Sequence, residues 1–131
     1  MAFHCTVVTP EAQAFDQSVS QVILPAHDGL LGILTDRAPL LVKLGIGPLR
    51  IDLAGNQRQY FFVEGGVAQM KDNRLTILTN EATPAAEIDA ESARAEYAEA
   101  VARIATGEKA YTDRQRQLQR ARAKQQLAGQ R

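Results

Sequence analysis

The sequence contains one cysteine and no tryptophan, and it has no long apolar run. The single cysteine, Cys5, cannot form a disulfide within the chain, which is typical of a reducing compartment. The longest apolar stretch, residues 30–34, is far shorter than the roughly 20 residues that a membrane-spanning helix needs. The first residues also lack the basic stretch and apolar core of a signal peptide. We therefore expect a cytosolic protein, which another protein holds at any membrane where it works.

An excess of either charge sign is missing too, because 15 basic and 15 acidic residues give a formal net charge of zero. Overall charge therefore indicates neither a nucleic-acid partner nor a membrane surface. The charges are instead segregated near the C-terminus. Residues 87–106 carry five acids and two bases, whereas residues 113–131 carry six bases and one acid. Opposite signs favour pairing of the two segments, and the second is able to bind an acidic surface, although most basic helices are simply solvated.

Sequence motifs of catalysis are also absent. There is no P-loop, no dinucleotide-binding glycine pattern, no Gly-x-Ser-x-Gly and no paired-cysteine motif. His27-Asp28 is most simply a surface turn, and Gly65-Gly66 a tight turn or bulge between strands. His4 and Cys5 lack the further ligands of a metal site. We expect no catalytic residue, no metal and no cofactor.

Short apolar runs separated by turn residues fill residues 1–84. Turn signals every 8–12 residues are typical of an antiparallel sandwich or barrel. Within residues 49–53, apolar and charged residues alternate as in a strand with one face in water. The runs predict strands over residues 3–8, 19–24, 30–34, 40–44, 49–53, 60–63, 67–70 and 75–78.

Residues 85–131 favour helix instead, because they are rich in Ala, Glu, Gln and Arg and contain no proline. Asp89 is a suitable N-cap for a helix to about Thr106, with Gly107 as its stop signal and Thr83-Pro84 as a rival start. A second helix is predicted from Thr112, which begins a capping-box pattern. The predicted fold class is therefore α+β, with an antiparallel β-sandwich in residues 1–84 followed by an antiparallel two-helix hairpin.

This hairpin offers little apolar surface with which to hold the sandwich. Burying a leucine contributes about 1.5–3 kcal/mol and burying an alanine far less, and helices this short are marginal alone. We expect a hairpin that detaches and rearranges; a static, solvated hairpin is the alternative. The first predicted stripe is Ala93, Tyr97, Val101 and Ile104, and the second is Tyr111, Arg114, Leu118, Ala121, Gln125 and Ala128.

Four blocks of sequence go further than composition. The blocks are Val7-Val8-Thr9-Pro10-Glu11 with Phe15; Gly29-Leu30-Leu31-Gly32-Ile33-Leu34 with Ala38-Pro39-Leu40 and Gly47; Val63-Glu64-Gly65-Gly66-Val67-Ala68 with Leu75-Thr76-Ile77-Leu78; and Glu87-Ile88-Asp89. In this order they resemble the epsilon subunits of bacterial F-type rotary ATP synthases, and they cover nearly the whole chain. Any one block alone is a weak signal, whereas the four together are specific.

The resemblance implies a non-catalytic subunit of the central stalk, on the cytoplasmic face of the bacterial inner membrane and peripheral to it. The sandwich would bind the gamma subunit and touch the rotor ring, which couples ring rotation to catalysis in the hexamer of alpha and beta subunits. The hairpin would fold on the sandwich or extend along gamma, where it would obstruct rotation in the hydrolysis direction. No nucleic-acid partner is implied, and membrane association would come only through the complex.

The resemblance also implies contact residues. Thr35-Asp36-Arg37 replaces the family's common Pro-x-His, so Arg37 would alter the local contact. The residues that would face the rotor ring, in neighbouring loops, are Asp28, Gly29, Leu30, Leu31, Thr35, Asp36 and Arg37. Those that would contact the hexamer or gamma are Arg116, Arg120 and Arg122.

Some bacterial members of this family bind ATP through the pattern Ile-Asp-x-x-Arg-Ala. Here Ser92 stands where the arginine belongs, and serine is not a charge-assisted phosphate ligand. Arg94 lies about 200° further around the helix and cannot simply substitute. A residual site would rely on Asp89, Arg94 and Arg122, and we expect little or no ATP binding.

A second function class remains open at this point. A stand-alone module could bind RNA or another anion with its basic helix, although that helix has no aromatic residue after Tyr111 for base stacking. An enzyme ranks third, because no nucleophile, metal cluster or acid/base pair is present.

Overall fold

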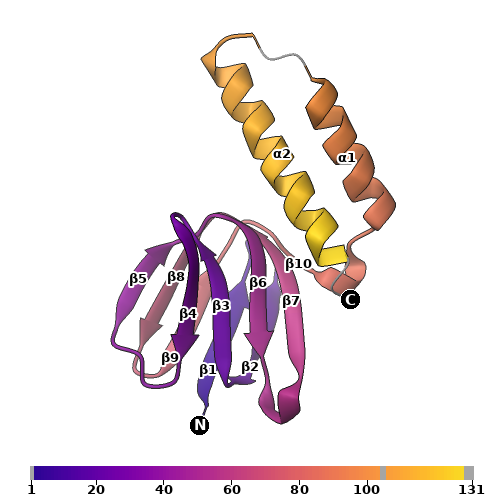
Figure 1. Cartoon of the computed structure of the whole chain (residues 1–131). Helices are drawn as coiled ribbons and strands as arrows, with labels where there is room; N and C mark the ends of the chain where they lie inside the picture. The colour runs from indigo at the N-terminus through magenta and orange to yellow at the C-terminus, as the bar shows by residue number, and fades with distance from the viewer. Residues whose placement is uncertain (1, 104–105, 129–131) are drawn as a thin grey trace.

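Alternating apolar residues build the N-terminal part of the chain into two packed sheets, and a two-helix hairpin stands at one end of them (Figure 1). The computed structural model describes residues 2–103 and 106–128. Sheet 1 has the strand order β2-β1-β9-β8-β5, and sheet 2 has the order β10-β7-β6-β3-β4. This arrangement confirms the predicted fold class, a β-sandwich followed by a helical hairpin.

The elements have the following bounds. The strands are β1 (Phe3–Val8), β2 (Gln13–Val19), β3 (Gln21–Ala26), β4 (Gly29–Leu34), β5 (Leu40–Lys43), β6 (Ile46–Asp52), β7 (Arg58–Glu64), β8 (Val67–Lys71), β9 (Arg74–Leu78) and β10 (Ala82–Pro84). The helices are α1 (Ala90–Ala102) and α2 (Glu108–Ala128), with short 3-10 turns η1 (Ala54–Asn56) and η2 (Ala85–Glu87).

The core lies between the sheets, because every second residue of a strand points inward. In β6, Leu49 and Ile51 are fully buried, whereas Arg50 and Asp52 face outward and form an ion pair with Nε and Oδ1 2.9 Å apart. The predicted alternation of residues 49–53 is therefore confirmed.

The turn between β7 and β8 requires glycine. Gly66 has a φ of +107°, and a Cβ atom there would lie 1.9 Å from the carbonyl oxygen of Leu78. No side chain fits that gap, so Gly65-Gly66 forms the tight connection that the sequence predicts.

Two strands were not predicted, and one pairing differs in direction. The edge strand β2 buries only Phe15 and Val19 among polar residues, so its apolar signal is weak. The edge strand β10 has only three residues. β1 and β9 pair in parallel within sheet 1, whereas the other pairs are antiparallel. β1 and β9 are far apart in the sequence, so no tight turn sets their relative direction.

The first helix begins as predicted and ends sooner. The carboxylate of Asp89 caps α1 by accepting a hydrogen bond from the backbone N–H of Glu91 at 3.0 Å. α1 ends at Ala102 rather than near Thr106, and the predicted stripe residue Ile104 lies outside the described residues.

The second helix begins at Glu108, four residues before the predicted start at Thr112. The carbonyl of Gly107 accepts the hydrogen bond from the N–H of Tyr111 at 3.1 Å, so the helical pattern is already established there. The hydroxyl of Thr112 donates to the carbonyl of Glu108 at 3.0 Å from inside the helix. The predicted capping box at Thr112 is therefore wrong, because serine and threonine also make this back-bond within helices.

Candidate interaction surfaces

The C-terminal half of α2 packs on β6, β7 and η2. Its apolar contact is small, and we call it the Phe62 cluster. Its buried members are Phe62, Ala85, Ile88, Ala123 and Leu127, with Ile46, Tyr60 and Ala128 packed at the edge. Leu127 is only 1% exposed, whereas Leu118, a residue of the second predicted stripe, is half-buried. The predicted stripe starts at Tyr111 and, at helical spacing, passes through Ala128 rather than Leu127. It therefore misses Leu127, although Leu127 is the last large apolar residue of the helix.

α1 rests on α2 through small residues. Ala93 is buried and Tyr97 is half-buried, as the predicted stripe requires. Ala100, which was not in the stripe, is buried as well. Val101 is 50% exposed, so its predicted place in the stripe is wrong. The hairpin therefore packs mainly through alanines, which bury little area.

Arg120 and Lys124 lie over the Phe62 ring and belong to a network of ion pairs that we call the docking cluster. Its members are Glu64, Glu81 and Glu96 on the acidic side and Arg116, Arg120 and Lys124 on the basic side. Nε of Arg120 lies 2.6 Å from Oε1 of Glu64, and Nζ of Lys124 lies 5.1 Å from the centre of the Phe62 ring. Cation–π contact and ion pairing thus reinforce the small apolar contact.

The three arginines predicted to contact the hexamer do not share one face. Arg116 and Arg120 point to the sandwich, where Arg116 lies 3.8 Å from Oε2 of Glu64. The guanidinium of Arg122 instead lies 5.9 Å from the centre of the Tyr97 ring on α1.

The residues predicted to face the rotor ring lie at opposite ends of β4. Asp28 to Leu31 are at its start, and Thr35 to Arg37 follow its end. Their prediction as neighbouring loops is wrong, because a six-residue strand spans about 20 Å. Leu31 is half-buried and packs on the core, whereas Leu30 is 69% exposed.

Polar contacts hold the loop of residues 35–37, which follows β4. The backbone N–H of Asp36 donates to Oδ1 of Asn73 at 2.8 Å, and the Thr35 hydroxyl donates to the carbonyl of Ala2 at 3.2 Å. The side-chain amide of Asn73 also donates to the Ala2 carbonyl at 3.2 Å. Asn73 thus joins this loop to the β8–β9 turn and to the first described residue.

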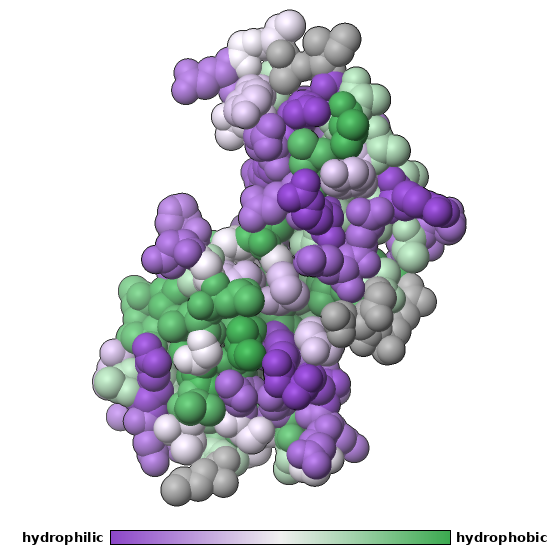
Figure 2. All heavy atoms as spheres, viewed as in Figure 1, coloured by the Kyte–Doolittle hydropathy of each residue, from purple (hydrophilic) through white to green (hydrophobic). Residues whose placement is uncertain are grey.

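An apolar patch covers the outer face of β3 and β4 (Figure 2). Leu30 and Leu34 are exposed on β4, with the half-buried Ile23 beside them on β3. At the β3–β4 turn, a hollow of about 580 Å³ opens toward β5 and is lined by Leu30 and the exposed Leu41. A contiguous exposed apolar patch is a candidate contact site for another protein.

The predicted nucleotide residues do not come together. Arg94 pairs with Glu91 on its own helix, and Arg122 lies over Tyr97. A hollow of about 250 Å³ adjoins Asp89 and Ser92, but four carboxylates line it against one amine. The carboxylates are those of Glu81, Glu87, Asp89 and Glu96, and the amine is that of Lys124. A triphosphate would meet net repulsion there.

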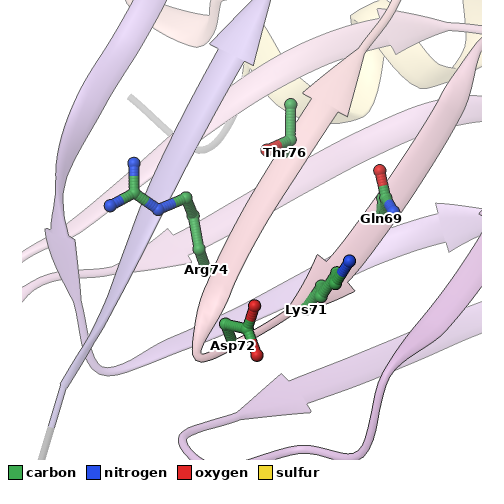
Figure 3. Close-up of a pocket in the computed structure, with 5 residues that line it drawn as sticks. All are labelled: Gln69, Lys71, Asp72, Arg74 and Thr76. Atoms are coloured by element: carbon green, nitrogen blue, oxygen red, sulfur yellow. The ribbon is translucent and has the colours of Figure 1, made fainter.

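A catalytic centre is not apparent in the described part of the chain. A hollow of about 270 Å³ lies on the outer face of sheet 1 (Figure 3). Lys71 and Arg74, which are paired across β8 and β9, line it with their charged ends pointing apart. Burial raises the pKa of the Cys5 thiol to about 12, so that thiol is a poor nucleophile. Among residues 2–103 and 106–128, we found no cluster of His, Cys, Asp or Glu that could hold a metal.

Comparison with known proteins identifies the family. The model of the ATP synthase delta/epsilon chain beta-sandwich domain matches residues 2–85. The ATP synthase epsilon chain of Gloeothece citriformis is 38% identical over 135 residues, covering 98% of this chain and 96% of the relative. The chloroplastic ATP synthase epsilon chain of Emiliania huxleyi is 43% identical over 95 residues, or 72% of each chain.

Solved structures agree on the fold. A chain in the mitochondrial ATP synthase of Euglena gracilis superimposes with a TM-score of 0.87 at 21% identity, covering 99% of this chain and 82% of that one. A chain in the central stalk and c-ring structure from Tetrahymena thermophila gives 0.73 at 17% identity, covering 94% and 93%. No helix in the described ranges has the length and apolar character to cross a bilayer. The chain belongs to the ATP synthase delta/epsilon family, as one of its epsilon chains.

Proposed function

We propose that this chain is a rotor and regulatory subunit of the central stalk. Residues 1–84 form the unit that transmits rotation, and residues 85–131 form a hairpin that restrains ATP hydrolysis. Its partners are the gamma subunit, the rotor ring and the alpha and beta subunits, on the cytoplasmic face of the bacterial inner membrane. Family membership supports the first role, and the way in which the hairpin docks supports the second.

The single observation that supports the regulatory role is the small contact between the hairpin and the sandwich. Leu127 is the large apolar residue that α2 brings to the Phe62 cluster, and its burial contributes about 1.5–3 kcal/mol, whereas Ala123 and Ala128 of the same helix contribute far less. The ion pairs of the docking cluster are partly exposed, so each contributes about 1 kcal/mol or less. Ordering the helices costs part of this gain. A docked state with so small a margin exchanges readily with a detached one.

The sandwich offers two adjoining surfaces for two partners, and Leu30 lies at the border between them. The apolar patch of Leu30, Leu34 and Ile23 suits the gamma subunit, because an extended apolar face favours a lasting interface. The hollow at the β3–β4 turn suits the polar loop of the rotor ring, which would meet Asp28 and Gly29 beside Leu41. The Thr35 to Arg37 loop lies at the far end of β4 and is left out of the ring contact.

The test is assembly of the complex around tagged chain. The gamma, ring, alpha and beta subunits should co-purify with the unchanged protein. The double variant Leu30→Lys with Leu34→Lys should lose most of the gamma subunit, because two charges would be placed in an apolar interface. Leu78→Lys is the matched control, since Leu78 is an exposed leucine on the opposite sheet. Equal retention of gamma by both variants would refute this assignment of the patch.

The alternative of a stand-alone anion-binding module is not favoured. In the docked hairpin, Arg116, Arg120 and Lys124 face carboxylates of the same chain. Arg114 donates to the carbonyl groups of Arg103 and Val101. The basic helix is thus occupied largely by internal partners.

A further inference from the structure

Glu64 holds a fixed position beneath the hairpin. It is the last residue of β7, and its side chain is only 14% exposed. The backbone around it is rigid, because Glu64 pairs with Ile46 of β6 and the N–H of Gly65 donates to the carbonyl of Gly45 at 3.0 Å. The obligatory glycine at position 66 fixes the chain on the other side. The carboxylate therefore presents a preformed anionic site to α2.

Arg120 fills that site and joins three elements. Its guanidinium lies 2.6 Å from Glu64 on β7, 3.4 Å from Glu81 before β10 and 3.8 Å from Glu96 on α1. Arg116 contacts the same Glu64 carboxylate from one turn earlier in α2. Two of the three arginines assigned to the hexamer contact are thus held by one carboxylate of the sandwich.

We propose that Glu64 is a latch that keeps the inhibitory arginines Arg116 and Arg120 out of reach of the hexamer while the hairpin is docked. The inference rests on the proposed regulatory function. The same guanidinium groups serve both states: they bind Glu64 in the docked state and an acidic surface of the hexamer in the extended state. Docking and inhibition therefore exclude each other through competition for the same charges.

This dual use predicts opposite effects for the two sides of the latch. Loss of the Glu64 charge weakens only the docked state, so the hairpin extends more often and inhibition increases. Loss of the Arg120 charge weakens both states, because the hexamer contact loses the same group. A passive ion pair, with no second use for the arginine, would make the two variants equivalent.

The latch itself is tested in the isolated full-length chain. The chain has no tryptophan, so Ala128→Trp provides a single fluorophore at the edge of the Phe62 cluster, with emission that shifts to the red when the hairpin leaves. In this background Glu64→Gln should raise the detached-to-docked ratio about fivefold, as expected for the loss of one partly exposed ion pair. Asp52→Asn, which removes an outward carboxylate of the same sheet far from α2, should leave the ratio unchanged.

Coupling between the two residues is measured with Arg120→Gln and the double variant. If Glu64 acts through Arg120, the double variant should be little worse than Arg120→Gln alone, because the shared contact is already lost. The latch is overturned if Glu64→Gln and Asp52→Asn shift the emission equally, or if the two substitutions at Glu64 and Arg120 are additive.

The consequence for inhibition is tested in the assembled complex. Glu64→Gln should lower ATP hydrolysis severalfold below that of the unchanged complex, whereas Arg120→Gln should raise it or leave it unchanged. If Glu64→Gln detaches the hairpin in the isolated chain but hydrolysis does not fall, the latch stands and the inhibitory half of the proposed function fails. If both variants lower hydrolysis alike, the shared use of Arg120 is wrong.

Discussion

The hydroxyl of Ser92 donates a hydrogen bond to Oδ2 of Asp89, with the two oxygens 3.0 Å apart. Asp89 is also the N-cap of α1. The ATP-binding pattern Ile-Asp-x-x-Arg-Ala would place an arginine at the position of this serine. Here the serine instead bonds the side chain that caps α1. Both residues line a hollow with more carboxylates than basic groups.

We therefore predict that the isolated chain binds ATP weakly or not at all. Each missing charged hydrogen bond costs about 1.5–3 kcal/mol, or roughly 10- to 100-fold in affinity. Isothermal titration calorimetry measures this directly, and Ser92→Arg is the matched variant, which should bind more tightly. A dissociation constant in the low micromolar range for the unchanged chain would contradict the prediction.

Truncation after Glu87 should preserve assembly and ATP synthesis while raising ATP hydrolysis by the complex. The large apolar residues of the main core all lie in the retained part, and the family model covers residues 2–85. Charge reversal at Arg116, Arg120 and Arg122 should mimic part of the effect, and high salt should weaken inhibition if the contacts are exposed. Hydrolysis would be compared at equal subunit content, and equal rates for intact, truncated and reversed complexes would rule out a regulatory hairpin.

Cysteine cross-linking should distinguish the two ends of β4. We predict that a cysteine at Leu30 cross-links to the polar loop of the rotor ring and that one at Arg37 does not, since β4 separates them by about 20 Å. Native Cys5 is buried and should not interfere. Cross-linking from Arg37 alone would place the ring at the opposite end of the sandwich.

Leu127→Ala should release the hairpin more than Leu118→Ala. Removing a fully buried leucine costs about 2–5 kcal/mol, whereas a half-buried one costs less. Amide hydrogen exchange should therefore accelerate in α1 and α2 of the Leu127 variant, while the strands remain protected. Equal exchange in both variants would indicate that Leu127 is not the anchor.

Cys5 should resist alkylation in the native protein. With the pKa of its thiol raised to about 12, the reactive thiolate is a fraction of about one in ten thousand at pH 8. Because deprotonation becomes favourable only as pH approaches 12, labelling should stay slow through pH 9 and become rapid once the chain is unfolded in guanidinium. Fast native labelling at pH 8 would contradict the burial of Cys5.

The sequence by itself determined the two-part architecture of this protein. Strand alternation in residues 49–53, the turn glycines at 65 and 66 and the Asp89 cap are local signals, and the structure confirms each one. The four sequence blocks also indicated the family correctly. The local signals succeeded because each depends on neighbours within a few residues, which a linear sequence displays, whereas the family followed from the order of four blocks along the chain.

Only the tertiary structure decided which residues meet across the fold. The pairing of β1 with β9, the burial of Leu127 against Phe62 and the three carboxylates around Arg120 all join distant segments. The same holds for the separation of Leu30 from Arg37, which are close in sequence but stand at opposite ends of an extended strand. In the sequence, a basic residue on a helix looks the same whether it faces water or a partly buried glutamate of another segment. Which one it faces depends on how the hairpin rests on the sandwich, and that packing is set by the whole fold.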